Sequence, residues 1–590
     1  MFLVLRSSLT WLLLIFVTAS CAKKDDYSQK ILYERIEQNV KGFDPIHSND
    51  YYSSREVGKV YEGLLEFHYL KRPYTVTPNL AKEMPQVSKN GLTYTFKIIP
   101  GVLFHDDECF PGGIGRELVA EDFVYSFKRL ADPKLVATGW WLFDEKIKGL
   151  NEWRNAQKDT AISDYSASIE GVKALDKYTL QFVLSKPFPQ FLYGLAMSFS
   201  YVVPKEAVDK YGAEFINHPV GTGPFTLKVY SPQTNKIEYY KNKKFRDKFY
   251  PSEGEESDKA NGLLADAGKK VPFLDKIVSY IMVEHNPAWL AILKGEIDEF
   301  KLPKDNLSQA ITDMNGPTEE LKSRGIEVVV ERALDVTYSG FNTQFELFKN
   351  NPKLRQAMSH AYDAGTANEL FYHNQGILAQ TPIPPGIAGY DENYKNPNVG
   401  YDLEKAKKLL AEAGYPGGKG LPEITYDNLS DTLARQMAEF FSNSLAKIGV
   451  KIKPIFNTWP EMTKKIDRQS VQLFAISWIA DYPDAENFLQ LFYGPNASPG
   501  SNNSNFNDPA YNALFEKVSK MQDSKERTEL YKKLARLGSE QLPWIFGVHR
   551  MNLRLKHSWL KNYKATEFKY GIEQYWDIDL EQKKLKKPQL

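Results

Sequence analysis

The sequence contains only two cysteines, Cys21 and Cys109, among its 590 residues. Two cysteines exclude a disulfide framework, which needs several pairs to hold a fold together. The chain also lacks an excess of charge of one sign, because 75 Lys and Arg residues stand against 74 Asp and Glu residues. A net charge of +1 gives no electrostatic reason to expect nucleic acid or an anionic lipid surface as the partner.

Signatures of catalysis are missing as well. The sequence has no G-x-S-x-G, H-E-x-x-H or G-x-x-x-x-G-K-[ST] motif, so no esterase nucleophile, zinc protease or phosphate loop is indicated. The segment HDDEC at 105–109 offers an imidazole, carboxylates and a thiol, which leaves a metal site open as an alternative. Adjacent side chains rarely converge on one ion, and no base can be named for Cys109. We therefore expect a protein that is not an enzyme and needs no cofactor or metal.

Apart from the N-terminal segment, the chain has no apolar run long enough to span a membrane. Residues 1–20 carry Arg6, the apolar stretch LTWLLLIFV and the small residues TAS, which is typical of a secretory signal. Cys21 resembles the lipidated first residue of bacterial lipoproteins, although Thr18 stands where Leu is commonest. We expect a signal peptide at 1–20, a lipid-anchor tether at 21–27, and a periplasmic or cell-surface protein. Plain secretion is the alternative.

Short strand-like runs alternate with amphipathic helices, which is typical of an α/β fold. LTYTFKII at 92–99 alternates like a strand, and EDFVYSFKRL at 121–130 has helical spacing. Asp402 begins a helical pattern that Gly414 ends. A second helix is predicted within 431–449, followed by the strand VKIKPIF. The charged insert at 243–271 is predicted to be a surface loop.

Segments along nearly all of the mature chain resemble, in the right order, the bacterial oligopeptide- and dipeptide-binding proteins. These are the extracellular solute-binding proteins, family 5, of ABC importers. The segments include VYEGLLEF (60–67), PNLAKEMPQVSKNGLTYTFKIIPGVLFHDD (78–107), VAEDFVYSFKRLADP (119–133), HPVGTGPFTL (218–227), PFLDKI (272–277), LKGEIDEF (293–300), KLRQAMSHAYD (353–363) and SWIADYPDAENFL (477–489).

The resemblance implies a periplasmic-binding-protein-like α/β fold, a class II-type cleft binder. Two lobes joined by a hinge would close over a ligand, with an extra domain on one lobe. By similarity, lobe I is discontinuous and covers 28–68, 203–304 and 552–590. The extra domain then covers 69–202, and lobe II covers 305–551.

The segment SWIADYPD carries the expected ligand site. Asp481 matches the family aspartate that receives the α-ammonium group of a peptide, and a buried ammonium needs such a compensating charge. The strand around Ser477 and Ile479 can add backbone hydrogen bonds to an extended peptide. Trp478 and Trp459 are expected to line side-chain pockets. The alternatives are a turn or helix cap for Asp481 and core packing for the two tryptophans.

Five further positions are relevant to the expected ligand site. Asp484 is better explained as the cap of a helix that begins near Ala485, while Asn49 and Tyr51 match a ligand-facing segment of the family. The arginines that hold the peptide carboxylate in some relatives fall on Ile466 and Ala475, neither of which can pair with a carboxylate.

The resemblance thus implies the substrate-binding component of an ABC importer. It would bind short peptides between its lobes, deliver them to a permease in the inner membrane, and act as a monomer. One alternative is the same fold with a nickel chelate, haem or an oligosaccharide as ligand. Others are a ligand sensor and a secreted hydrolase.

Overall fold

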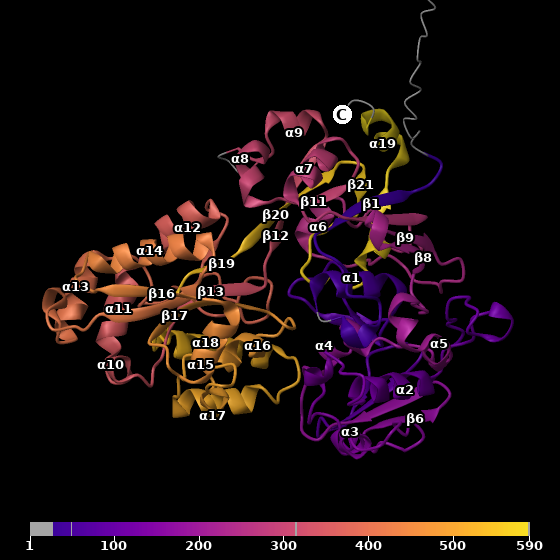
Figure 1. The fold of residues 1–590 in the computed structure, drawn as a ribbon, viewed down its shortest axis with the longest axis horizontal. Coiled ribbons are helices and arrows are strands. Elements are labelled where there is room, and N and C mark those ends of the chain that lie inside the picture. The colour runs from indigo at the N-terminus through magenta and orange to yellow at the C-terminus, as the bar shows by residue number, and fades with distance from the viewer. Residues whose placement is uncertain (1–26, 49, 313–315, 588–590) are drawn as a thin grey trace, which may run out of the picture.

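The computed structural model describes residues 27–48, 50–312 and 316–587. The elements form three groups around separate sheets (Figure 1). We assign these groups to lobe I, the extra domain and lobe II, and the boundaries stated above remain a proposal. The helices predicted at 121–130, after Asp402 and within 431–449 are confirmed as α2 (Ala120–Ala131), α13 (Leu403–Glu412) and α14 (Thr432–Ala446).

Lobe I is built from segments that are far apart in the sequence. Its first sheet has the order β1-β10-β9-β8, in which only β1 and β10 run parallel. A second sheet, β11-β20-β12, is antiparallel throughout. It joins β12, which lies within the stretch 305–551 expected for lobe II, to strands of lobe I. The bounds are β1 (Ile31–Ile36), β8 (Phe225–Ser231), β9 (Lys236–Lys241), β10 (Lys276–Ile281), β11 (Glu299–Lys301), β12 (Ile326–Arg332) and β20 (Met551–His557).

The extra domain contains the antiparallel sheet β4-β5-β7-β6, covered by α2 and α3 (Leu150–Gln157). Phe182 of β7 contacts Phe96, Phe127 and Phe191 edge-on, with ring centroids 4.9 to 6.0 Å apart. Such edge-to-face pairs are the preferred aromatic geometry. The strands are β4 (Gln86–Val87), β5 (Thr93–Lys97), β6 (Val172–Asp176) and β7 (Thr179–Val183).

Lobe II has the sheet order β16-β15-β17-β13-β18, with helices on both faces (Figure 1). Successive residues of β17 point to opposite faces, so Leu473 packs with the cluster of α11, α13 and α14, and Phe474 packs with that of α15, α17 and α18. The bounds are β13 (Asp335–Phe341), β15 (Ile424–Leu429), β16 (Ile452–Asn457), β17 (Leu473–Ile479), β18 (Trp544–Phe546), α11 (Pro352–Ala361), α15 (Trp459–Asp467), α17 (Pro509–Val518) and α18 (Lys525–Glu540).

Two short crossings join lobe I to lobe II. β12 continues through Ala333 and Leu334 into β13, and β19 (Val548–His549) continues through Arg550 into β20. The Arg550 amide donates to Asp335 Oδ1 at 2.9 Å, the Arg550 guanidinium pairs with the same buried carboxylate, and the Ala333 amide donates to Arg550 O at 3.0 Å. The crossings are therefore bonded side by side, and we expect bending between the lobes to concentrate there.

A buried ion network packs α1 (Tyr51–Val60) against the first sheet of lobe I. Lys59 of α1 is completely buried, and its ammonium lies 2.5 Å from Glu34 of β1 and also pairs with Glu56. Tyr239 of β9 donates to the second Glu56 oxygen at 2.6 Å. Buried charges are tolerated only when they are paired in this way.

Lys59→Met is expected to lower the free energy of unfolding by about 3 kcal/mol, because it leaves Glu34 and Glu56 buried without their shared cation. Guanidinium denaturation at neutral pH measures the difference. Lys243→Met, on an exposed lysine, is the control and should change stability little. A loss below about 1 kcal/mol for Lys59→Met would contradict the importance of this network.

Candidate ligand-binding site

The loop after β17 holds Asp481 in one orientation. Asn487 is completely buried, and its Oδ1 accepts both the Asp481 amide at 3.1 Å and the Trp478 indole N–H at 2.9 Å. Its Nδ2 donates to Asp481 Oδ2 at 3.0 Å. One buried amide therefore fixes the carboxylate and the indole relative to each other. Asn487 was not singled out by the sequence, although it follows Trp478 by nine residues.

Asp481 has no cationic partner among the residues that the structure describes. Its side chain remains reachable by solvent, but the surrounding protein desolvates it, and burial raises the pKa of Asp481 above its ordinary value while the Asn487 bond opposes the shift. Tyr570 of lobe I lies close by: burial and, second, the charge of Asp481 raise the pKa of its hydroxyl. An unpaired carboxylate thus faces lobe I.

Asp484 has a different environment only three residues away. Its carboxylate is buried, pairs with Arg527 at 2.8 Å and accepts the Tyr531 hydroxyl at 2.8 Å. It also accepts the backbone amide of Glu486, the first residue of α16 (Glu486–Leu489), at 2.8 Å. Asp484 was predicted to cap this helix, but the N-cap residue is Ala485. Asp484 lies one residue earlier, where its carboxylate bonds the first helical amide and forms the ion pair that anchors this loop to α18.

One edge of β17 is open beside Asp481. β17 pairs with β13 along its whole length, but it pairs with β15 only at Leu473 and Phe474. The Ala480 amide donates to Leu334 O at 2.8 Å, so the backbone N–H and C=O groups of Ala480 point toward the β13 side. These groups alternate in direction along a strand, and those of Ser477 and Ile479 therefore point away from β13. Among the described residues, the backbone donors and acceptors of Ser477 and Ile479 on this side pair with no neighbouring strand, so they are available for the predicted contacts with a peptide.

Trp459 and an arginine lie at the same edge of the sheet. β16, β15 and β17 run parallel, so their carboxyl ends meet where ligands bind in open α/β sheets. Trp459 begins α15 two residues after the end of β16 and is 53% exposed. Arg435, in the first turns of α14 after β15, donates to Ser430 O at 3.0 Å and lies 4.2 Å from the Phe456 ring centroid. It pairs with no carboxylate of the described residues.

The remaining predicted positions divide into three cases. Ile466 of α15 is buried in the core cluster on one face of the lobe II sheet, and Ala475 of β17 packs against the cluster on the other face. Both side chains are uncharged, so neither can bind a peptide carboxylate. Tyr51 begins α1 and belongs to a charge network of lobe I, where Arg554 Nη2 lies 3.4 Å from its hydroxyl. Cys21, with the signal segment, and Asn49 lie outside the described residues.

Two α/β lobes with a double crossing, a carboxylate that is unpaired among the described residues and an open strand edge are compatible with a ligand-binding protein. The sequence profile of the bacterial extracellular solute-binding proteins, family 5, matches residues 75–500, and the chain belongs to this family. Its members are substrate-binding proteins rather than enzymes, they bind peptides, and they work with ABC transporters.

The chain is similar to relatives of more than one ligand class. It is 28% identical to Heme-binding protein A of Haemophilus influenzae over 92% of this chain and 91% of that protein. It is 29% identical to the Dipeptide-binding protein of Escherichia coli K12, covering 88% and 89% of the two chains. Among solved structures, HbpA2 from Haemophilus parasuis has a TM-score of 0.76 at 25% identity, with 93% and 100% coverage. DppA from Helicobacter pylori with the peptide STSA has a TM-score of 0.66 at 26% identity, with 93% and 99% coverage.

The relatives confirm the predicted family and α/β fold. Within the described ranges, no helix combines the length and the apolar character that a membrane span requires.

Asn487→Ala is expected to raise the pKa of Asp481 further, because the Asn487 amide donates to the ionised carboxylate and stabilises that form. Carboxyl-detected NMR titration of the ligand-free protein measures the shift. The Trp478 fluorescence maximum should move in the same variant, because the indole N–H loses its acceptor. Asn503→Ala, elsewhere in lobe II, is the control; an unchanged Asp481 titration in Asn487→Ala would contradict this arrangement.

Proposed function

We propose that this protein captures short peptides between its two lobes and delivers them to a membrane permease of an ABC importer. The observation that carries the proposal is Asp481, a fixed carboxylate that lacks a cation and lies beside an open strand edge. The family relationship supports the same conclusion, since relatives named for dipeptides and for di- or tripeptides match most of the chain.

Asp481 is proposed to receive the α-ammonium group of the peptide. A carboxylate that the protein has already desolvated and oriented gains most from a charged donor, because the donor replaces solvation that folding has removed. Asn487 keeps the carboxylate aimed while the ligand is absent. Trp478, held by the same amide, and Trp459 are proposed to line the pockets for ligand side chains.

The main chain of the peptide is proposed to add to the free edge of β17. The groups of Ser477 and Ile479 then bond peptide amides and carbonyls, as in strand addition. The gap from Ile479 back to Ala475, where β15 takes over, is roughly 13 Å at ~3.3 Å per residue. That length corresponds to about four extended residues, so short peptides of up to about four residues are the proposed ligands.

Arg435 is proposed to hold the peptide carboxylate at the other end of this gap. Its guanidinium lies beside Ser430, just past the end of β15, and Arg is well suited to bidentate carboxylate recognition. This assignment supplies the partner that Ile466 and Ala475 cannot provide. A sequence pattern could have indicated Arg435 as a candidate, because a predicted strand is followed by a helix that carries this arginine in its first turns.

The cellular setting is proposed from the sequence. A signal peptide at 1–20 and lipidation of Cys21 would place the protein outside the cytoplasm, anchored to a bacterial membrane by lipid. The protein is proposed to act as a monomer, with the peptide and the permease as its partners. It performs no chemistry on the ligand, because a clamp and a strand edge bind without a nucleophile.

Asp481→Asn is expected to weaken binding of a free-ended dipeptide by about a hundredfold or more, because the ligand ammonium loses its buried counter-charge. Isothermal titration calorimetry measures the loss. The ligand-free melting temperature should stay unchanged or rise slightly, because a desolvated carboxylate is removed.

An N-acetylated dipeptide is the matched control for Asp481→Asn. It lacks the ammonium group and should bind the native protein and the variant with equal weakness. Equal affinity of the free-ended dipeptide for both proteins would refute the clamp. A Soret band in the purified native protein, without dipeptide binding, would favour the haem alternative instead.

Arg435→Gln is expected to weaken binding of the same dipeptide about 10- to 100-fold, because a charged hydrogen bond to the carboxylate is lost. C-terminally amidated dipeptide should bind the native and variant proteins alike. Arg468→Gln, on an exposed arginine of the same lobe, is the control substitution. If Arg435→Gln leaves the affinity for the free-ended dipeptide intact, the carboxylate is held elsewhere.

A further inference from the structure

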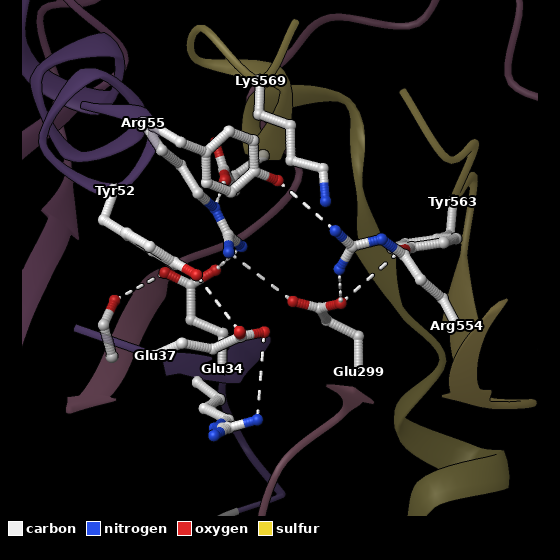
Figure 2. A network of polar contacts seen from close by, with 12 residues as sticks. Glu34, Glu37, Tyr52, Arg55, Glu299, Arg554, Tyr563 and Lys569 are labelled. Atoms are coloured by element: carbon white, nitrogen blue, oxygen red, sulfur yellow. Dashed lines mark hydrogen bonds and ion pairs between the residues drawn. The ribbon is translucent and has the colours of Figure 1, made fainter. Parts of the chain in front are cut away.

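A polar cavity of about 230 Å³ lies in lobe I between α1 and the sheet β11-β20-β12. Tyr51 and Tyr52 of α1, Glu299 of β11 and Arg554 of β20 line it together with Glu567. Figure 2 shows the surrounding network, in which Arg554 reaches Glu299 from one side and Arg55 approaches from the other. The space corresponds to roughly eight water molecules at ~30 Å³ each.

The lining of this cavity contains as many carboxylates as cations, four of each. Glu37, Glu299 and Glu331 each form an ion pair with an arginine of the lining. A buried carboxylate is costly unless a proton or a partner removes its charge. One lining carboxylate is left without such a pair.

Glu567 is the carboxylate that remains without a partner. Neither of its oxygens forms a hydrogen bond or ion pair with the described residues, and Oε1 is shielded from solvent. Burial, with the charge of Glu331 next, raises the pKa of Glu567 to about 7. Oε1 of the buried Glu331 also lacks a hydrogen bond and lies 3.5 Å from the Lys569 ammonium. Two carboxylate oxygens at this cavity can thus accept a donor.

Most cations of the cavity are engaged elsewhere. Arg554 bonds Glu331 at 2.8 Å and Glu299 at 3.1 Å, and Arg55 pairs with Glu34 and Glu573. Arg35 donates to the backbone oxygens of Met282 and Val283. Lys569 lies 3.5 Å from Glu331 and over the Tyr51 ring, and its ammonium forms no hydrogen bond with the described residues, while Lys301 is exposed at the rim. None of these cations forms an ion pair with Glu567.

The cavity lies close to the proposed ammonium clamp. Side chains of the extended segment 566–570 alternate between its two faces. Glu567 lines the cavity on one face, whereas Phe568 stacks on Phe67 on the other face, with ring centroids 4.5 Å apart. Tyr570 lies on the same face as Phe568, and the charge of Asp481 helps to raise the pKa of its hydroxyl. One extended segment thus lies between the two unpaired carboxylates.

We propose that Glu567 is a specificity-determining residue that receives the basic side chain of a peptide whose α-ammonium is held by Asp481. The ligands favoured are then dipeptides with Lys or Arg, whose two positive groups match the two unpaired carboxylates. Tyr51 and Tyr52 offer flat faces for the methylene chain and for the cation. This inference rests on the proposed function and goes beyond it by naming a class of peptide.

Calorimetric titration with four dipeptides tests the inference. At pH 8 the native protein should bind the tighter of Lys-Ala and Ala-Lys at least about tenfold better than its uncharged counterpart, Met-Ala or Ala-Met. Glu567→Gln should abolish this advantage and leave the Met peptides unaffected. Glu581→Gln, on exposed α19 (Leu580–Lys586), should keep it.

The advantage should also shrink at pH 6. A carboxyl whose pKa is raised to about 7 is mostly protonated there and ionises as the pH rises through 7. Glu331, Arg554, Lys301 and Lys569 face the same carboxyl and set its titration. No histidine lines the cavity, so an advantage that falls with pH reports on Glu567.

Different failures have different meanings. Equal affinity of Lys and Met peptides for the native protein overturns the role of Glu567 while the peptide function stands, and so does an advantage that survives in Glu567→Gln. The first outcome uses the native protein alone and does not depend on whether the variant folds. For the second outcome, binding of the Met peptides by Glu567→Gln shows that the variant is folded. No binding of any dipeptide overturns the proposed function and this inference with it.

Discussion

A desolvated carboxylate without a counter-ion is the constraint on which the cleft depends. Burial raises the pKa of Asp481 above its unfolded value, so its contribution to stability is present below the unfolded pKa and is lost as the pH rises through the folded pKa. At neutral pH the ionised group therefore costs the ligand-free protein some stability. In the proposed function, a ligand ammonium would offset this cost when the lobes close, and the free energy gained would be available for binding.

The neighbouring Asp484 shows how the protein supports this unfavourable group. Its pairing with Arg527, Tyr531 and the Glu486 amide fixes the loop to α18 from within, so Asp481 need not be paired to be ordered. Asn487 completes the support with neutral hydrogen bonds, which orient a carboxylate without neutralising it. Two carboxylates three residues apart thus differ because of their neighbours and not because of their chemistry.

Local signals were sufficient for much of the fold, but not for the charges of the cleft. α13 could be predicted because Asp402 and the pattern it caps are adjacent in the sequence. The role of Arg435 depends on β15 ending beside β17, which is set by a register between residues about fifty positions apart. The isolation of Glu567 depends on several distant segments meeting. The insert at 243–271 was predicted to be a surface loop, yet Arg246 within it forms a buried ion pair with Glu62, a long-range contact that composition cannot reveal.

The sheet geometry explains how one cleft can be tolerant and selective at once. β15 stops at Leu429 while β17 continues to Ile479, which leaves a gap that any extended main chain can fill, since every peptide carries the same backbone donors and acceptors. Tolerance for side chains follows from that gap. Selectivity must then come from charges at fixed points around it, because a misplaced or missing charge leaves a buried group unpaired. Asp481 and Arg435 would bind the two ends of the ligand and so select its length. Glu567 belongs to a segment of the opposite lobe and would contact the ligand only when the lobes close. Peptide length and side-chain charge would then be selected by different lobes of the protein.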